Sequence, residues 1–237
     1  MKIIEQFFCC VMFLLITTSC GFAHIIDPDT SFEFQYKADL AEVAPVVDGF
    51  LDDPVWEEVE SSKLDQEVKA GSPWQESDDF KGTFAAVWRN GSLYLAVQLT
   101  DDQVDTYHEK LSRQDHLEIY LDIDHTGHKS DLYRYMIPVG EDASPSSSQL
   151  MLVVWSNDGQ SCELSFSLGR TPRKEEVIGF GMYYNDVDQG HLQHKFGWEP
   201  VGQTESEDFL ADLVFTAKLK PNNNQKAIQW GGIKSLY

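Results

Sequence analysis

Apolar and polar residues alternate with a period of two along most of the chain. In residues 116–122, for example, Leu117, Ile119 and Leu121 fall on one side of the pattern and polar residues fall on the other. A period of two places alternate side chains on opposite faces of a β-strand. By this pattern we expect strands over residues 83–88, 93–99, 116–122, 132–139, 149–155, 162–168, 177–184 and 209–219.

Turn signals separate these runs. Asn90-Gly91 stands between two of them and is a strong hairpin signal, and Asn157-Asp158-Gly159 marks a second turn. One short helix is expected over residues 54–60, because Asp53 can cap its first turn and proline suits its first position. This pattern predicts an all-β fold, an antiparallel β-sandwich of jelly-roll or immunoglobulin-like type, with one short helix near the N-terminus.

The beginning of the chain has a different pattern. The apolar run over residues 7–16 has the length of a signal-peptide core and is short for a membrane span. Thr18-Ser19-Cys20 resembles the end of a bacterial lipobox, whereas Gly21-Phe22-Ala23 offers a rival cut after Ala23. We therefore expect an exported protein. It would be an outer-membrane or cell-surface lipoprotein if Cys20 is lipidated, and periplasmic or secreted otherwise, with membrane contact only through the lipid.

Length and composition favour a single domain after the leader. The hydrophobic content of 42% is enough for a sizeable core and argues against disorder. The expected organisation is a signal peptide over residues 1–19 (to 23 after the rival cut), an N-terminal segment over 24–39, a β-sandwich over 40–220 and a C-terminal tail over 221–237.

Acidic residues outnumber basic ones, which gives a formal net charge of -21. This charge argues against nucleic-acid binding, which needs clustered Lys and Arg. It fits both a well-solvated surface and cation binding in acidic loops. Asp101, Asp102 and Asp105 follow a predicted strand, and Asp115 can fold back toward them. Calcium prefers such oxygen ligands, so these four residues are candidate ligands of a structural calcium ion, and a solvated acidic loop is the alternative.

Several short motifs follow one another over residues 40–219. They are Val47-Asp48-Gly49-Phe50-Leu51-Asp52 with Trp56, the run 93–97 followed by Thr100-Asp101-Asp102, the run 115–122 (DHLEIYLD), Glu163 within its strand, and Val177-Ile178-Gly179-Phe180 with Asn185-Asp186 and then Trp198. In this order and spacing the motifs resemble those of the family 9 carbohydrate-binding modules.

The resemblance implies a sandwich that binds glucan or related sugars and carries structural calcium. Members of the family hold the sugar between two tryptophans, because the apolar faces of pyranose rings stack on aromatic rings while hydroxyls need fixed polar partners. Trp198 matches the second tryptophan, and Asn185 and Asp186 would offer hydrogen bonds beside it.

Two family positions differ in this chain. The first tryptophan would fall near Ser112, so Tyr107 or Trp74 would have to replace it. The position of a sugar-contacting arginine holds Met136, and Arg134 lies two residues earlier on the same strand face. The resemblance therefore implies a sugar site with altered contacts.

The leading hypothesis is a non-catalytic module that binds oligo- or polysaccharide outside the cytoplasm. It would serve carbohydrate catabolism by holding the sugar for glycoside hydrolases on separate chains. A glycoside hydrolase would need two carboxylates across one bond, for which Glu118 and Glu163 are candidates. A haem-binding electron carrier would need axial ligands such as Met136 with His191 or His194. A purely structural surface protein is a further alternative.

Overall fold

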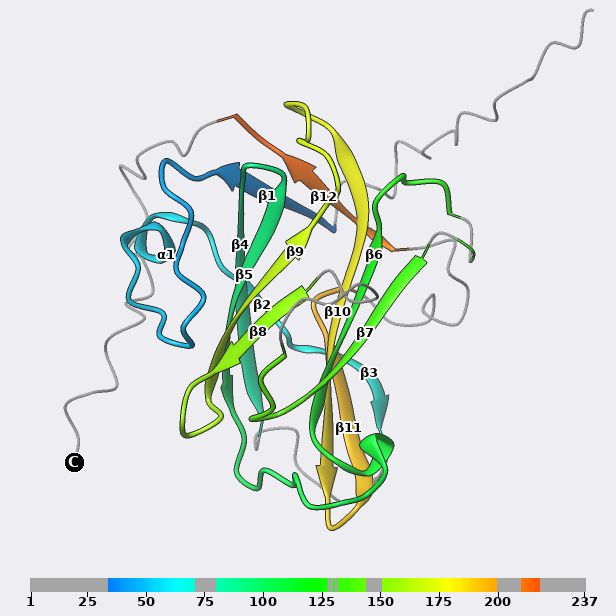
Figure 1. Ribbon diagram of the computed structural model, residues 1–237. Helices are drawn as coiled ribbons and strands as arrows, with labels where there is room; N and C mark the ends of the chain where they lie inside the picture. The colour runs from blue at the N-terminus through cyan, green and yellow to red at the C-terminus, as the bar shows by residue number, and fades with distance from the viewer. Residues whose placement is uncertain are drawn as a thin grey trace, which may run out of the picture.

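The computed structural model describes residues 34–70, 80–127, 130, 132–143, 151–199 and 210–217. These residues form a β-sandwich with one α-helix and one 3-10 turn (Figure 1). The elements are β1 (Gln35–Leu40), α1 (Pro54–Glu58), β2 (Ser62–Lys63), β3 (Gln66–Ala70), β4 (Lys81–Arg89), β5 (Ser92–Thr100), η1 (Leu111–Arg113), β6 (His116–Asp122), β7 (Leu132–Pro138), β8 (Met151–Trp155), β9 (Ser161–Ser167), β10 (Val177–Asp188), β11 (His191–Gly197) and β12 (Ala211–Phe215).

Two groups of strands make the layers, and β1 joins them. The first sheet runs β7-β6-β10, and the other edge of β10 pairs with β12 near its start and with β11 near its end. The second sheet runs β4-β5-β9-β8, with β2 beside β4. The pairing is antiparallel throughout, except that β1 pairs in parallel with β12 and then with β4. The all-β sandwich predicted from the sequence is confirmed.

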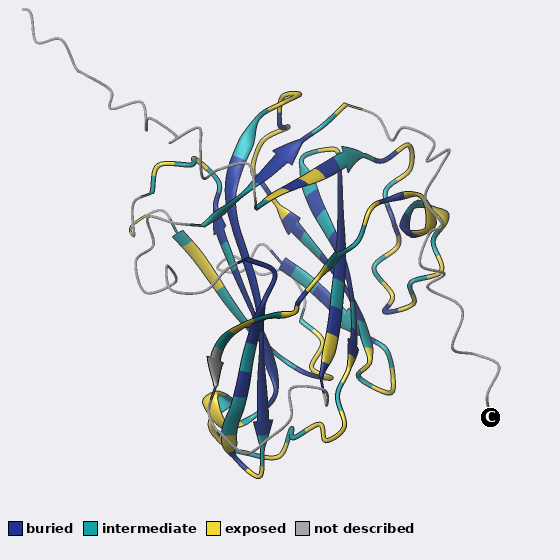
Figure 2. Ribbon diagram, turned by 180° about the vertical axis from the view of Figure 1, so that it is seen from behind, coloured by how far each residue is buried: buried dark blue, intermediate teal, exposed yellow. Residues whose placement is uncertain are grey.

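The main core lies between the two sheets, where the dark-blue buried positions of Figure 2 are concentrated. Leu117, Ile119 and Leu121 face it from β6, as their alternation predicts. Leu93 and Leu95 face it from β5. Burial of these side chains is the main contribution that holds the layers together, at about 25 cal/mol per Å² of apolar surface.

A smaller core lies on the outer face of the second sheet, beneath α1. Trp56 of α1 packs there, and its Nε1 donates a hydrogen bond to Oε1 of Glu163 on β9 at 2.7 Å. Oε2 of Glu163 accepts from the backbone N–H groups of Asp48 and Gly49 at 2.9 and 3.1 Å. One buried carboxylate therefore attaches the whole Asp48–Trp56 motif to the sheet.

Most of the expected strands are present at nearly the expected bounds. The Asn90-Gly91 turn is confirmed, with positive φ at both residues (52° and 80°), the conformation that a two-residue hairpin requires. The helix is present, but the side chain of Asp53 makes no capping bond. Its Oδ2 accepts instead from the N–H of Val46 at 2.7 Å.

Four of the observed strands were not expected from the sequence. Two of them are the short strands β2 and β3 before β4, and a third is β11 over residues 191–197. Residues 35–40 form β1, so the sandwich begins before residue 40.

Several expectations concern residues outside the described ranges. These are the leader with Cys20, the aromatic residue Trp74 and the tail over 221–237. Within the ranges that are described, no helix has the length and apolar character needed to cross a membrane.

Candidate functional site

The outer face of the first sheet carries a row of polar and aromatic side chains. Register fixes which residues share this face, because residues directly opposite on neighbouring strands point the same way. Glu118 lies opposite Met136 on β7 and opposite Tyr183 on β10, and Tyr120 lies opposite Arg134. One step along, Asn185 lies between His116 and Lys195.

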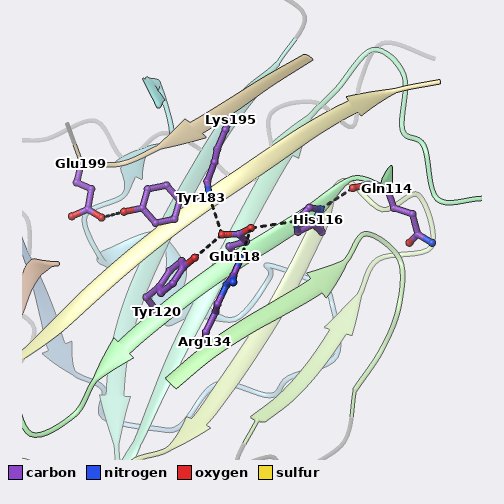
Figure 3. A network of polar contacts seen from close by, with 8 residues as sticks. All are labelled: Gln114, His116, Glu118, Tyr120, Arg134, Tyr183, Lys195 and Glu199. Carbon is purple, nitrogen blue, oxygen red and sulfur yellow. Dashed lines mark hydrogen bonds and ion pairs between the residues drawn. The ribbon is translucent and has the colours of Figure 1, made fainter. Parts of the chain in front are cut away.

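Glu118 is at the centre of this face and is bonded on all sides (Figure 3). Its Oε2 accepts from the hydroxyl of Tyr120 at 2.8 Å and from Nζ of Lys195 at 2.9 Å. Its Oε1 accepts from Nη2 of Arg134 at 3.2 Å and lies 3.5 Å from Nε2 of His116. Nδ1 of His116 bonds to the carbonyl oxygen of Gln114 at 2.8 Å, so both of its ring nitrogens face acceptors.

These partners decide the ionisation of Glu118. Burial alone would raise the pKa of its carboxyl group, but the hydrogen bond from His116 and the charge and hydrogen bond of Lys195 outweigh burial. The pKa is therefore far below its usual range. The group is a carboxylate at every physiological pH, held between cations from β7 and β11.

Two tyrosines complete the surface. The guanidinium of Arg134 lies 5.5 Å from the ring centroid of Tyr120, and Nζ of Lys195 lies 4.8 Å from that of Tyr183. The Tyr183 ring is buried against Gly197, where an added Cβ would lie 2.8 Å from its Cδ1 atom. The Tyr183 hydroxyl donates to Oε1 of Glu199. Each ring thus has a cation nearby, and Tyr120 remains half-exposed.

The residues expected to bind sugar are divided among three places. Arg134 and Asn185 belong to the face around Glu118. Asp186, next along β10, points to the opposite side and joins an acidic cluster. Tyr107 is 93% exposed in the loop between β5 and β6, and no contact with the Glu118 network is observed among the described residues.

Trp198 does not have the position of a stacking platform. Only 6% of it is exposed, and its ring packs at 5.7 Å against both Phe84 and Phe180 and at 6.4 Å against Tyr36. A ring enclosed by other aromatics has no face to offer a pyranose. Trp198 is a core residue, so the sequence-based assignment of this tryptophan as a ligand contact is corrected here.

The acidic residues expected to bind metal are brought together only in part. Oxygens of Asp101, Asp115 and Asp186 all lie within 4.8 Å of one another. Asp102 is exposed and outside this group, and Asp105 contributes its backbone N–H to Oδ2 of Asp115. Burial raises the pKa of Asp115 to about 8, although the N–H groups of Asp105 and Val187 favour its charged form.

The geometry also bears on the alternative functions. Glu118 lies on the outer face of the first sheet, and Glu163 lies on the outer face of the second, beneath α1. The two carboxylates therefore cannot flank one glycosidic bond. Met136 faces outward beside Glu118, whereas the ring of His194 stacks on Phe196 of the core at 5.4 Å, so these two cannot bind one iron atom.

Sequence reasoning named Glu118 only as a candidate catalytic carboxylate, and it did not single out Tyr120 or Lys195 of the same network. Glu118 and Tyr120 lie on the polar side of the alternating pattern over residues 116–122, and that pattern was the available signal. Lys195 gave no signal, because the sequence predicts no strand over its segment and its partner lies 77 residues away in sequence.

Comparison with known proteins places the fold in a family. The family model described as "Carbohydrate family 9 binding domain-like" matches residues 47–209, more than half of the chain. No curated protein sequence matches the chain.

Among solved structures, the chain is similar to a family 9 carbohydrate-binding module from Caldicellulosiruptor kristjanssonii. The complex with cellotriose gives a TM-score of 0.66 at 16% identity, over 81% of this chain and 97% of that one. The complex with glucose gives 0.64 at 16% identity, over 80% and 99%. The chain belongs to the family 9 carbohydrate-binding modules.

Proposed function

We propose that this protein binds oligo- or polysaccharide without catalysing a reaction, and that it does so on the face around Glu118. The observation that supports this site most strongly is the ordered network of Glu118, Tyr120, Arg134 and Lys195 on an outer sheet surface. The chain belongs to a family of carbohydrate-binding domains, and its structural neighbour is seen with cellotriose and with glucose.

The chemistry of this face suits a sugar. Hydroxyl groups need partners whose positions are fixed before binding, because ordering flexible side chains reduces the affinity. Here Arg134 and Lys195 are held by the same carboxylate, so their remaining N–H groups are already oriented. The half-exposed ring of Tyr120 and the side chain of Met136 supply apolar surface for the C–H groups of a pyranose.

A glycan array followed by calorimetric titration tests the proposal. The wild-type protein is expected to bind at least one oligosaccharide, and Glu118→Ala is expected to abolish that binding. Glu57→Ala removes an exposed carboxylate from α1 and should bind like the wild type. Binding that survives Glu118→Ala in a folded protein would place the site elsewhere, and no binding by the wild type would refute the function.

The acidic cluster supports a second proposal, a structural calcium ion held by Asp101, Asp115 and Asp186. Calcium takes carboxylate and carbonyl oxygens, and the residues fit that preference. The described donors to Asp101 and Asp115 are a tyrosine hydroxyl and backbone N–H groups, all of them neutral. Three carboxylates this close repel one another when ionised, and a divalent cation would remove that repulsion.

We also propose that the protein acts outside the cytoplasm and delivers sugar to glycoside hydrolases on other chains, in carbohydrate catabolism. The support is the sequence of the leader, with Cys20 as the lipidation candidate. Mass spectrometry of the N-terminal peptide distinguishes a lipid-modified Cys20 from a chain that begins after Ala23. An intact leader in cell extracts would contradict export.

A further inference from the structure

The hydrogen-bonding capacity of Glu118 is fully used within the protein. A carboxylate has about four acceptor positions. The described contacts of Glu118 occupy four such positions. Tyr120 and Lys195 contact one carboxylate oxygen, and Arg134 and His116 contact the other. Glu118 therefore organises this surface and has no acceptor position left for a ligand hydroxyl.

The two cations beside Glu118 keep N–H groups that Glu118 does not use. Guanidinium carries five N–H groups and ammonium carries three, and neither accepts a hydrogen bond. Arg134 directs one N–H to Glu118 while 51% of its side chain is exposed, and Lys195, at 17% exposure, likewise uses one. The side-chain nitrogen of Asn185 is buried without a partner among the described residues, between His116 and Lys195 in the register.

The positive and negative charges of the network are also unequal in number. Arg134 and Lys195 are two cations facing the single carboxylate of Glu118, so the network has an excess of positive charge. The net charge of -21 is spread over the whole chain, and salt screens charges beyond about 8 Å at physiological ionic strength.

Two acidic groups lie further along the face. Oδ2 of Asp122 accepts from the N–H of Gly127, while its Oδ1 is buried without a partner among the described residues. Glu199 accepts from the Tyr183 hydroxyl and from the N–H of Ala211. Burial raises the pKa of Glu199 to about 7, which reduces its charge at neutral pH. The charged side chains in direct contact with Glu118 are the cations Arg134 and Lys195.

From these observations we propose that the sugar recognised at this face bears an anionic group, a uronate carboxylate or a sulfate ester, which Arg134 and Lys195 bind. This inference rests on the proposed function and specifies its ligand. An anionic group offers only acceptors and the side chains of Arg134 and Lys195 offer only donors, and the planar fork of an arginine suits a carboxylate.

The test is titration calorimetry of the full protein with three probes: an oligogalacturonide, a sulfated galactan oligosaccharide and cellotriose. We expect one of the two anionic probes to bind at least about tenfold more tightly than cellotriose, as one charge-assisted hydrogen bond implies. We also expect this preference to shrink as NaCl is raised. The preferred anionic probe identifies the group as carboxylate or sulfate.

Arg134→Gln provides the residue-level test, because this exposed side chain can change without disturbing the core. It should weaken binding of the anionic probe about tenfold and make the remaining binding less sensitive to NaCl. Arg113→Gln, an exposed arginine of η1, is the matched control and should bind as the wild type does. Cellotriose binding as tight as, or tighter than, both anionic probes would overturn the inference but leave the proposed function intact. Failure to bind any glycan would refute the proposed function itself.

Discussion

Nζ of Lys195 on β11 lies 2.9 Å from Oε2 of Glu118 on β6, although the two strands are separated by β10. The contact spans the width of three strands and fixes both side chains on one surface. Only the pairing of β10 with both neighbours brings these residues together. The proposed sugar site therefore depends on the first sheet as a whole.

Replacing Lys195 with methionine should weaken oligosaccharide binding by about tenfold or more, because it removes a donor and leaves Glu118 with fewer partners. It should also destabilise the fold by about 1–3 kcal/mol, since a largely buried carboxylate loses a charged hydrogen bond. Calorimetry and urea unfolding measure the two effects. Lys81→Met, at an exposed position of β4, is the matched control. Unchanged affinity in the Lys195 variant would remove this residue from the site.

Trp198→Ala should act on stability. The ring packs among Tyr36, Phe84 and Phe180, and removing a buried tryptophan costs about 3–5 kcal/mol. Denaturant unfolding measures this loss, and the folded fraction should bind sugar with nearly normal affinity. Tyr107→Ala, which removes a 93% exposed ring, should leave stability unchanged. A Trp198→Ala protein of normal stability that no longer binds sugar would restore the platform role.

Glu163→Ala should destabilise the protein by about 2–5 kcal/mol, because it leaves the N–H groups of Asp48, Gly49 and Trp56 without their acceptor. Urea unfolding followed by tryptophan fluorescence reports the change. Glu58→Ala on the exposed side of α1 should have little effect. Equal stability of the two variants would show that the Asp48–Trp56 motif does not need this anchor.

Without calcium, stability should fall as the pH rises from about 5 to 8. Burial raises the pKa of Glu163 and of Glu199 from 4.5 to about 7, and that of Asp115 from 3.8 to about 8. In this window the folded protein binds more protons than the unfolded chain, so raising the pH favours unfolding. Thermal unfolding in EDTA at several pH values measures the slope. A stability that rises across this window would contradict the assignment of these shifts.

Calcium should reverse that slope, since an ion that binds the ionised cluster of the folded state stabilises it by an amount that grows with the logarithm of the free calcium concentration above the dissociation constant. At 100 times the dissociation constant the gain is about 2.7 kcal/mol. Asp115→Asn should abolish the gain, and the exposed Asp102→Asn should retain it. The same calcium effect in both variants would exclude this cluster as the binding site.

The sequence allowed the sandwich to be predicted because alternation and turn chemistry are local signals. The Asn90-Gly91 hairpin and the strand over residues 116–122 were predicted at the bounds observed. Trp198 was misplaced because its position in the family motif implied a ligand contact, whereas the ring is covered by residues far away in sequence. Lys195 and Glu118 could not be paired, since their contact depends on register across β10.

The central claim is that sugar binds on the face around Glu118, and chemical-shift mapping tests it most directly. The account predicts that titration with a bound oligosaccharide shifts backbone amide signals of β6, β7 and β11 around Glu118, Arg134 and Lys195. Backbone amide signals around Trp56 in α1 should not shift. Shifts confined to the α1 side, or to the loop that carries Tyr107, would contradict the claim.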